Sequence, residues 1–229
     1  MLGHVLDKIP MGNVEKGEKI HFFSDIMKEN WPKPPEVSID PWKDLSYIMY
    51  TGGTTGFPKG VPGNHIGEVS YINDIMEDVA GDFVEEGKDV VLMVNPLFHI
   101  MAKGFTIAFG FNFGNTVVLM PLPEVDAVLS AIERYKVRWM LGVPALFRMF
   151  LENDRLEQYD LSSLRYCYCG GDFFPAEVFK IWKEKYNIPL YQVYGSTEIG
   201  HVTYSPLDRD PSPNTIGKPL KTRKSIVVD

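Results

Sequence analysis

Residues 165–198 read RYCYCGGDFFPAEVFKIWKEKYNIPLYQVYGSTE, two short apolar runs separated by a longer amphipathic segment. The runs Arg165–Cys169 and Leu190–Val193 have the length of buried strands. Between them Pro175 stands where a helix would begin, a position that tolerates its missing N–H. The residues expected on the apolar face of that helix are Val178, Ile181 and Trp182. This succession is typical of a βαβ unit with parallel strands.

The same alternation continues toward the N-terminus. Further strand patterns are Tyr47–Thr51, Val90–Val94, Thr116–Met120 and Arg138–Gly142. Amphipathic faces are formed by Val69, Ile72, Met76 and Val79, and, after Pro123, by Val125, Val128, Leu129 and Ile132. We therefore expect an α/β fold with a doubly wound, mainly parallel sheet flanked by helices and with ligand loops at the carboxyl ends of the strands. We expect residues 1–41 to form a polar, proline-rich lead-in and residues 42–229 the core, with Ile226–Val228 as a further strand.

The composition is that of an ordinary soluble globular protein, with 45% hydrophobic and 23% charged residues. The net charge of −7 argues against a nucleic-acid partner, although a local basic pocket for one nucleotide is compatible with it. No apolar run approaches the ~20 residues of a membrane span, and the first ten residues lack a secretory pattern. Cys167 and Cys169 would share one face of a strand, without the second pair that a zinc site needs. We expect buried, reduced thiols and a cytoplasmic location.

The stretch YTGGTTGFPKG, residues 50–60, follows the first strand pattern directly. Its glycines let backbone amides converge on an anion, its threonines add hydroxyl donors, and Lys59 supplies a mobile positive charge. It is not a Walker A loop, because Pro58 precedes the lysine and Gly60 follows it. These residue types, placed after a strand, predict a polyphosphate-binding loop.

This loop resembles the phosphate loop of the adenylate-forming superfamily, which comprises acyl-CoA synthetases, luciferases and the adenylation domains of peptide synthetases. Four further segments are similar to the same family in the same order: Asn95-Pro96-Leu97-Phe98-His99, Gly142-Val143-Pro144-Ala145-Leu146-Phe147, Gly170-Gly171-Asp172-Phe173-Phe174-Pro175 and Tyr194-Gly195-Ser196-Thr197-Glu198. Gly52 stands where many members carry serine, and glycine at this position is similar to the loop of the medium- and long-chain fatty acyl-CoA synthetases. The resemblance runs from Phe22 to Asp229 and implies ATP-dependent activation of a carboxylic acid to acyl-AMP and then acyl-CoA.

The resemblance also implies roles for individual residues. Tyr194 would stack on adenine, Thr197 would bond the α-phosphate, and Glu198 would ligate Mg²⁺. Lys59, Thr197 and Glu198 are the expected catalytic residues, with Thr54 as a second metal ligand. The expected nucleotide contacts are Thr51, Gly52, Gly53, Thr54, Thr55, Gly56, Lys59, Gly170, Gly171, Asp172, Tyr194, Gly195, Ser196 and Thr197. The expected acid pocket is formed by His99, Met101, Phe105 and Gly171.

The ligands implied are ATP, Mg²⁺, a small carboxylic acid and coenzyme A as co-substrate. Met101, Phe105 and Phe109 stand at i, i+4 and i+8 and favour a fatty acyl chain, although the same stripe suits core packing. The alternatives are an aryl acid, an amino acid held by Asp172, or a non-catalytic nucleotide-binding module. Peripheral membrane contact and an oligomer are left open, although no amphipathic basic helix supports membrane binding.

The family's large domain continues beyond the stretch that this chain matches. Relatives carry a ribose-binding aspartate and, in a small C-terminal domain, a lysine, and nothing after Gly217-Lys218-Pro219 supplies either. We therefore expect this chain to be the nucleotide-binding core of a larger acid–thiol ligase, weakly active or inactive by itself.

Overall fold

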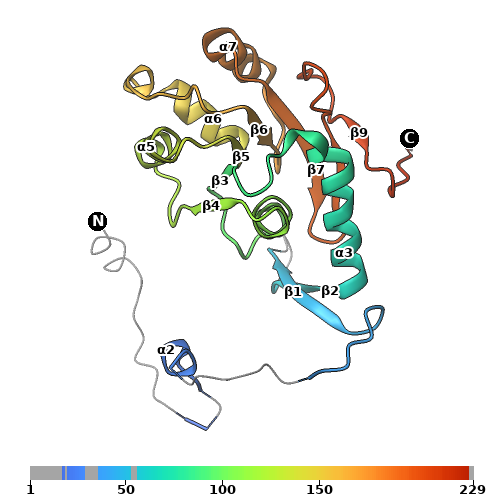
Figure 1. Cartoon of the computed structure of the whole chain (residues 1–229). Coiled ribbons are helices and arrows are strands. Elements are labelled where there is room, and N and C mark those ends of the chain that lie inside the picture. The colour runs from blue at the N-terminus through green and yellow to red at the C-terminus, as the bar shows by residue number, and fades with distance from the viewer. Residues whose placement is uncertain (1–16, 19, 29–35, 53–55, 227–229) are drawn as a thin grey trace. The chain divides into compact units, whose positions relative to one another are not determined.

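A computed structural model describes residues 17–18, 20–28, 36–52 and 56–226 of the chain. The chain divides into two compact units, Met1–Ile39 and Asp40–Asp229. In the first unit a β-bridge joins Gly17 to Ile20, and helix α2 covers Phe23–Ile26. The other described elements belong to the second unit (Figure 1).

The second unit alternates strands and helices. Its strands are β1 (Leu45–Thr51), β2 (Lys59–Asn64), β3 (Val90–Met93), β4 (Thr116–Leu119), β5 (Trp139–Gly142), β6 (Tyr166–Cys169), β7 (Leu190–Ser196), β8 (Gly200–Tyr204) and β9 (Lys218–Pro219). Its α-helices are α3 (His65–Asp74), α4 (Ile100–Phe105), α5 (Val125–Tyr135), α6 (Pro144–Leu151) and α7 (Ala176–Tyr186). The π-helical segments η1 (Ile75–Ala80) and η3 (Thr106–Asn112) continue α3 and α4, and η2 (Gly81–Phe83) and η4 (Leu156–Gln158) are short 3₁₀ turns.

The main sheet has the strand order β4-β3-β5-β6-β7-β8-β9. Strands β3 to β7 pair in parallel, and β8 and β9 are added antiparallel. The expected α/β fold with a mainly parallel sheet is confirmed. From β3 the chain passes to one neighbouring position, β4, and then returns to β5 on the other side of β3. Such a reversal opens a crevice at the carboxyl ends of the two strands, where α/β proteins bind ligands.

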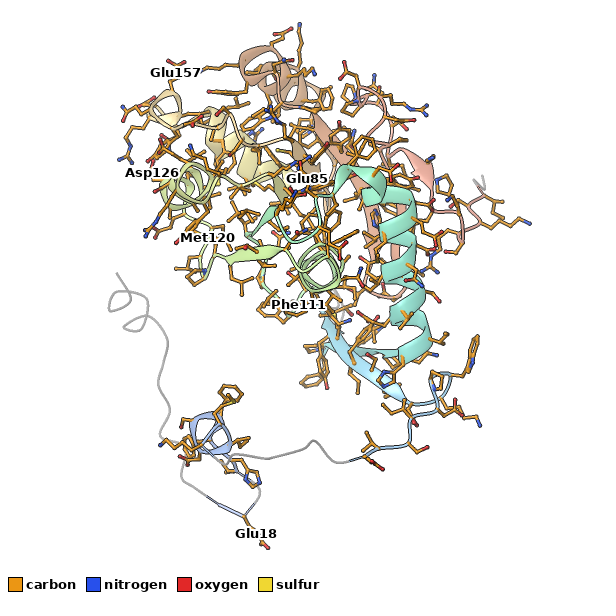
Figure 2. All side chains as sticks on the ribbon, in the orientation of Figure 1. Glu18, Glu85, Phe111, Met120, Asp126 and Glu157 are labelled. Carbon is orange, nitrogen blue, oxygen red and sulfur yellow. The ribbon has the colours of Figure 1, made fainter. Side chains whose placement is uncertain are left out.

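Alternate residues of the parallel strands enter two separate hydrophobic cores, because strand side chains point to opposite faces. Leu92, Met140 and Cys167 pack against α5, α6 and α7. The core on the other face contains Trp139 and Tyr168 together with residues of α3, η1 and η3. Figure 1 shows α5–α7 grouped on one side of the sheet and α3 on the other, and side chains fill both layers (Figure 2). Cys169 shares the first core with Cys167, so the two thiols lie buried on one face as expected.

The first strand pattern does not join the main sheet, so its expected place in a parallel sheet is wrong. β1 pairs antiparallel with β2 in a separate hairpin, with Thr51 opposite Lys59. The chain stays extended through Pro62, and a helix begins only where the Asn64 side chain accepts a hydrogen bond of 2.9 Å from the Gly67 amide. The glycine-threonine loop is therefore the tip of a β-hairpin.

Three details of the helices and strands also differ from expectation. Val69 and Ile181 are 54% and 41% exposed, because α3 and α7 turn neighbouring residues toward the core. β7 extends beyond Val193 through Ser196 because it pairs with β8. Ile226 is not in a strand, and residues 227–228 lie outside the described residues.

Candidate active site

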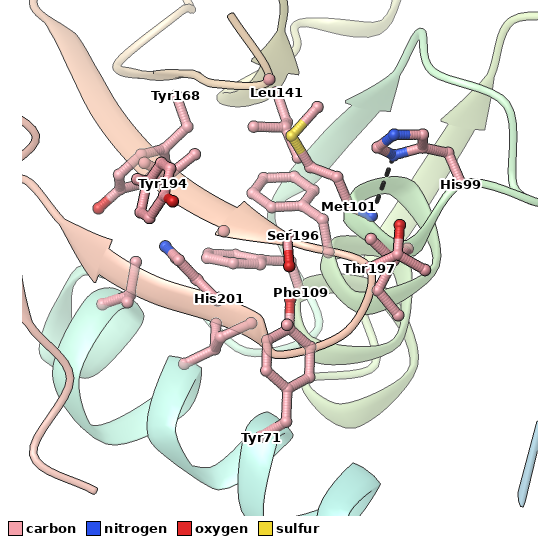
Figure 3. A pocket seen from close by; sticks show the side chains of 18 of the residues that line it. Tyr71, His99, Met101, Phe109, Leu141, Tyr168, Tyr194, Ser196, Thr197 and His201 are labelled. Carbon is pink, nitrogen blue, oxygen red and sulfur yellow. Dashed lines mark hydrogen bonds between the residues drawn. The ribbon is translucent and has the colours of Figure 1, made fainter. Parts of the chain in front are cut away.

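A cavity of about 270 Å³ lies between the sheet and the helices α3 and α4, at the carboxyl ends of the parallel strands (Figure 3). Its apolar and aromatic lining consists of Tyr71, Ile75, Val79, Ile100, Met101, Phe105, Phe109, Leu141, Tyr168 and Val193. The remaining lining residues are His99, Gly171, Tyr194, Gly195, Ser196, Thr197, Glu198, Gly200 and His201. One cavity thus combines an apolar wall with the polar groups of the turn that connects β7 to β8.

The β7–β8 turn presents a carboxylate that is held by its own neighbour. Ser196 Oγ donates a hydrogen bond of 2.8 Å to Glu198 Oε2. This bond holds the pKa of the exposed Glu198 carboxyl below its usual value, so the group is ionised at neutral pH. In the described part of the chain no three His, Cys, Asp or Glu side chains gather into a metal cage. A single ionised carboxylate fits Mg²⁺, which keeps most of its ligands as waters and substrate phosphates.

Close backbone packing shapes the loop after β6. A Cβ atom at Gly170 would lie 2.6 Å from Val193 Cγ2 and 2.8 Å from the Val193 carbonyl oxygen. Gly171 has a φ of +87°, a conformation that disfavours any side chain. These glycines let the loop after β6 lie directly against β7.

A second cavity, of about 810 Å³, begins at the same loop. It shares Gly171, Val193, Tyr194 and Gly195 with the first cavity and is otherwise lined by residues such as Asp172 and Phe173. Tyr194 is 49% exposed and therefore offers an aromatic face where the two cavities meet. Asp172 lines only the second cavity, and its Oδ1 accepts a hydrogen bond of 2.7 Å from the Phe173 amide.

Helix α4 brings the expected acid-pocket residues together. His99 is its N-cap, with Nδ1 accepting a hydrogen bond of 3.3 Å from the Met101 amide. Phe105 stacks on Phe109 at 4.2 Å between ring centroids, and Phe109 packs on the buried Trp139 at 4.8 Å. His99, Met101, Phe105 and Gly171 all line the first cavity, as do Tyr194, Gly195, Ser196, Thr197 and Glu198. Gly170 is buried and lines neither cavity.

The described residues of the expected phosphate loop are not part of either cavity lining. Thr51 and Lys59 face each other across the β1–β2 hairpin, and Gly52, Gly56 and Lys59 are exposed. None of these four residues lines either cavity. The predicted contacts at Gly53, Thr54 and Thr55, including the metal ligand Thr54, lie outside the described residues.

The hairpin that carries this loop is anchored to the walls of the first cavity. Lys103 of α4 forms an ion pair with Glu68 of α3, and both side chains are largely buried. The Lys103 ammonium also lies 3.7 Å from the centroid of the Tyr47 ring of β1. Lys103 therefore connects the β1–β2 hairpin with helices α3 and α4.

Tyr71 and His201 are among the cavity residues that the sequence analysis did not predict. The rings lie edge to face, 6.5 Å apart. Burial lowers the pKa of His201 to about 4 and raises the pKa of Tyr71. Tyr71 stands beside the apolar positions used to recognise its helix, and His201 reads as an ordinary strand residue after the Glu198 turn. Neither residue stands in a sequence motif that would have indicated a binding site.

Across the residues that the structure describes, no helix has the length and apolar character needed to cross a membrane.

Comparison with known proteins identifies the family to which this chain is similar. The family model described as "AMP-binding enzyme" matches residues 5–229. A long-chain-fatty-acid–CoA ligase of Bacillus subtilis (strain 168) is 30% identical over 195 residues, which are 83% of this chain and 34% of that protein. A 4-coumarate–CoA ligase of Arabidopsis thaliana is 34% identical over 167 residues, which are 72% of this chain and 30% of that protein. The chain thus spans about a third of the length of the curated relatives it matches.

Solved structures agree with the sequence relatives. The N-terminal domain of FACL13 from Mycobacterium tuberculosis has a TM-score of 0.71 at 28% identity, over 81% of this chain and 45% of that one. The anthranilate CoA ligase AuaEII in complex with anthranoyl-AMP also gives 0.71, at 27% identity over 78% of this chain and 34% of that one. The strand order, the cavity at the strand ends and these matches agree, and the chain belongs to the adenylate-forming family of AMP-binding enzymes.

Proposed function

We propose that this chain is the nucleotide-binding core of an acid–CoA ligase that uses ATP to convert a carboxylic acid to an acyl-adenylate. The observation that carries the proposal is the first cavity, where the Tyr194–Glu198 turn meets an apolar, aromatic wall. The acid would lie along the apolar wall with its carboxylate toward the turn. Adenine would lie against Tyr194, in the adjoining second cavity.

The hypothesised reaction is attack of a carboxylate oxygen on the α-phosphorus of ATP, with pyrophosphate leaving. The thiol of coenzyme A then attacks the acyl carbon, and AMP leaves. The acid is already ionised at neutral pH, so no base is needed for the first step. The main difficulty is the repulsion between two anions, which positioning and charge neutralisation overcome.

Three side chains of this chain meet that difficulty. The Thr197 hydroxyl donates to the α-phosphate oxygen on which charge develops. Lys59, on the hairpin, neutralises the polyphosphate. Glu198 would hold Mg²⁺, which would supply further neutralisation of the phosphate charge.

The cavity favours an aryl acid or an acid of short to medium length. Besides Tyr194, the aromatic side chains of Tyr71, Phe105, Phe109 and Tyr168 line a space of about 270 Å³. Flat rings pack well against such walls. An amino acid is a weaker candidate, because Asp172, the expected partner of its amine, lines the other cavity. The related proteins include both fatty-acid and 4-coumarate ligases.

The test is ATP–pyrophosphate exchange on the full chain with benzoate, cinnamate and fatty acids of increasing length, together with calorimetric binding of Mg·ATP. We expect Mg·ATP to bind, and any exchange to be strongest with aryl acids. Glu198→Gln should abolish the Mg²⁺-dependent part of nucleotide binding, and Lys59→Ala should weaken it. Absence of nucleotide binding by the wild-type chain would contradict the proposal.

A further inference from the structure

We propose that His201 is a specificity-determining residue that recognises a hydroxyl group on the acid, so that the preferred substrate is a hydroxylated aryl acid. This inference rests on the proposed function, because it takes the first cavity to be the acid site. It concerns the end of the substrate remote from its carboxylate.

The position of His201 supports this role. Its ring lines the first cavity, on the side opposite His99 in Figure 3. His99 caps the helix that follows β3, and Figure 3 shows it beside Thr197 of the β7–β8 turn. An acid whose carboxylate lies near that turn therefore extends toward His201.

The hydrogen bonding of His201 is incomplete. Nε2 is buried and has no partner among the described residues. Burying a polar atom without a partner costs free energy that a ligand recovers when it supplies the missing bond. The neighbouring cavity residues Ile75, Val79 and Phe109 offer no polar atom. The hydroxyl of Tyr168 is already directed to the Ser205 carbonyl oxygen, at 3.4 Å.

The chemistry of the ring defines the ligand group. Burial keeps the imidazole neutral at physiological pH, so it attracts no anion, and a hydrogen bond to the Thr203 backbone leaves Nε2 as the ring atom available to a ligand. A hydroxyl group both donates and accepts, so it pairs with Nε2 in either tautomer. The surrounding aromatic side chains favour a ring as the carrier of that hydroxyl. A site built to bond a hydroxyl also discriminates strongly against the analogue that lacks it.

The experiment compares 4-hydroxybenzoate and 3-hydroxybenzoate with benzoate. Binding to the full chain is measured by calorimetry in the presence of Mg·ATP. We expect the wild-type chain to bind one hydroxylated acid about tenfold more tightly than benzoate, which corresponds to one net hydrogen bond. In His201→Phe this preference should disappear, with benzoate affinity kept or improved. In His201→Gln, which restores an amide donor and acceptor, part of the preference should return.

The outcomes separate the two proposals. Equal affinity of the wild-type chain for all three acids would overturn the role of His201 and leave the acid site standing. A hydroxyl preference that survives in His201→Phe would overturn it as well. Binding of Mg·ATP without any of the three acids would contradict the aryl-acid site itself. The wild-type comparison needs no variant, so it can overturn the role of His201 even if a substitution prevents folding.

Discussion

Gly195 lies so close to Gly200 across the β7–β8 hairpin that Gly195 has no room for a side chain. A Cβ atom at Gly195 would lie 2.2 Å from the Gly200 carbonyl oxygen, and Gly200 itself has a φ of +66°. The atom in the way belongs to the backbone and cannot rotate aside. The turn that presents Ser196 and Glu198 to the cavity is therefore fixed in shape by its two flanking glycines.

Gly195→Ala should disturb this turn. The added methyl group must push β7 and β8 apart, so we expect the free energy of unfolding to fall by about 1–3 kcal/mol and nucleotide binding to weaken. Urea titration and Mg·ATP calorimetry measure the two effects. Gly56→Ala is the control for stability, because a Cβ atom there would meet nothing within 4 Å. Equal stability of Gly195→Ala and wild type would show that the hairpin is not packed as described.

Ser196→Ala should change the pH dependence of Mg²⁺-assisted nucleotide binding. The Ser196 hydroxyl donates to the Glu198 carboxylate and favours its ionised form, which lowers its pKa. Without that bond the pKa rises toward its usual value, and binding should be lost at a higher pH as the solution is acidified. Affinity for Mg·ATP measured between pH 7 and pH 4 shows the shift. In Glu198→Gln, whose side chain cannot titrate, this loss of affinity at low pH should be missing. If Ser196→Ala loses affinity at the same pH as the wild type, the Ser196 hydroxyl does not control the pKa of Glu198.

The parallel part of the sheet could be predicted from sequence because its strands are short, apolar and separated by long amphipathic helices. Trp139–Gly142 and Tyr166–Cys169 differ from the expected bounds by one residue at their starts. The β1–β2 hairpin could not be predicted, since Lys59–Asn64 contains two glycines and a proline, residues that are depleted in strands. The pairing of that segment depends on a partner strand, not on its own composition.

The candidate site was predictable where residues adjoin one another in sequence. The Tyr194–Glu198 turn and the α4 residues His99, Met101 and Phe105 reach one cavity because each follows a strand of the sheet. Tyr71 and His201 were not predictable, because they reach the cavity from a helix and from an antiparallel strand. Only the packing of α3 across the sheet brings those rings together.

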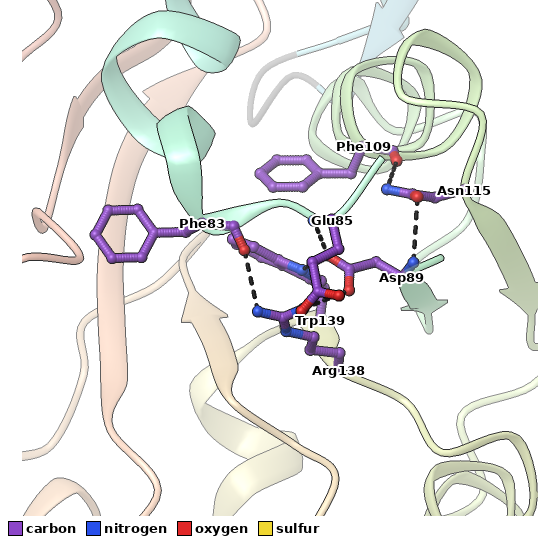
Figure 4. A network of polar contacts seen from close by, with 7 residues as sticks. All are labelled: Phe83, Glu85, Asp89, Phe109, Asn115, Arg138 and Trp139. Carbon is purple, nitrogen blue, oxygen red and sulfur yellow. Dashed lines mark hydrogen bonds and ion pairs between the residues drawn. The ribbon is translucent and has the colours of Figure 1, made fainter. Parts of the chain in front are cut away.

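Removal of the Asp89 carboxylate should strongly destabilise the fold. Asp89 is 3% exposed, and its oxygens accept hydrogen bonds from Trp139 Nε1 at 2.7 Å, Arg138 Nη1 at 2.9 Å and the Glu85 amide at 2.9 Å (Figure 4). Trp139 in turn packs against Phe109 of the cavity wall. Asp89→Ala leaves the Trp139 indole N–H and the Glu85 amide without this acceptor, while Arg138 keeps the Glu85 carboxylate and the Phe83 carbonyl oxygen. We expect a loss of about 3–5 kcal/mol in the free energy of unfolding.

Chemical denaturation of Asp89→Ala tests this expectation. Asp160→Ala is the matched control, because it removes a half-exposed carboxylate that bonds Lys136 at 2.8 Å and the Ser162 amide at 2.9 Å on the surface. Exposed pairs contribute little, so the control should change stability far less. Comparable losses in the two variants would mean that the Asp89 network does not support the cavity wall.

His201 should make the stability of the protein depend on pH below neutrality. Its pKa is lowered by burial from 6.5 to about 4, so the unfolded chain binds a proton that the folded chain does not. Stability from this group is therefore complete above about pH 6.5 and is lost as the pH falls toward 4, by roughly 3 kcal/mol in total. Urea titrations at pH 7.5, 5.5 and 4.5 measure the change for the wild type and for His201→Phe. Other titrating groups are common to both chains. The free energy of unfolding should therefore fall less for His201→Phe than for the wild type as the pH is lowered. A gap that stays constant with pH would mean that the imidazole is hydrated and protonates as easily in the folded chain as in the unfolded one.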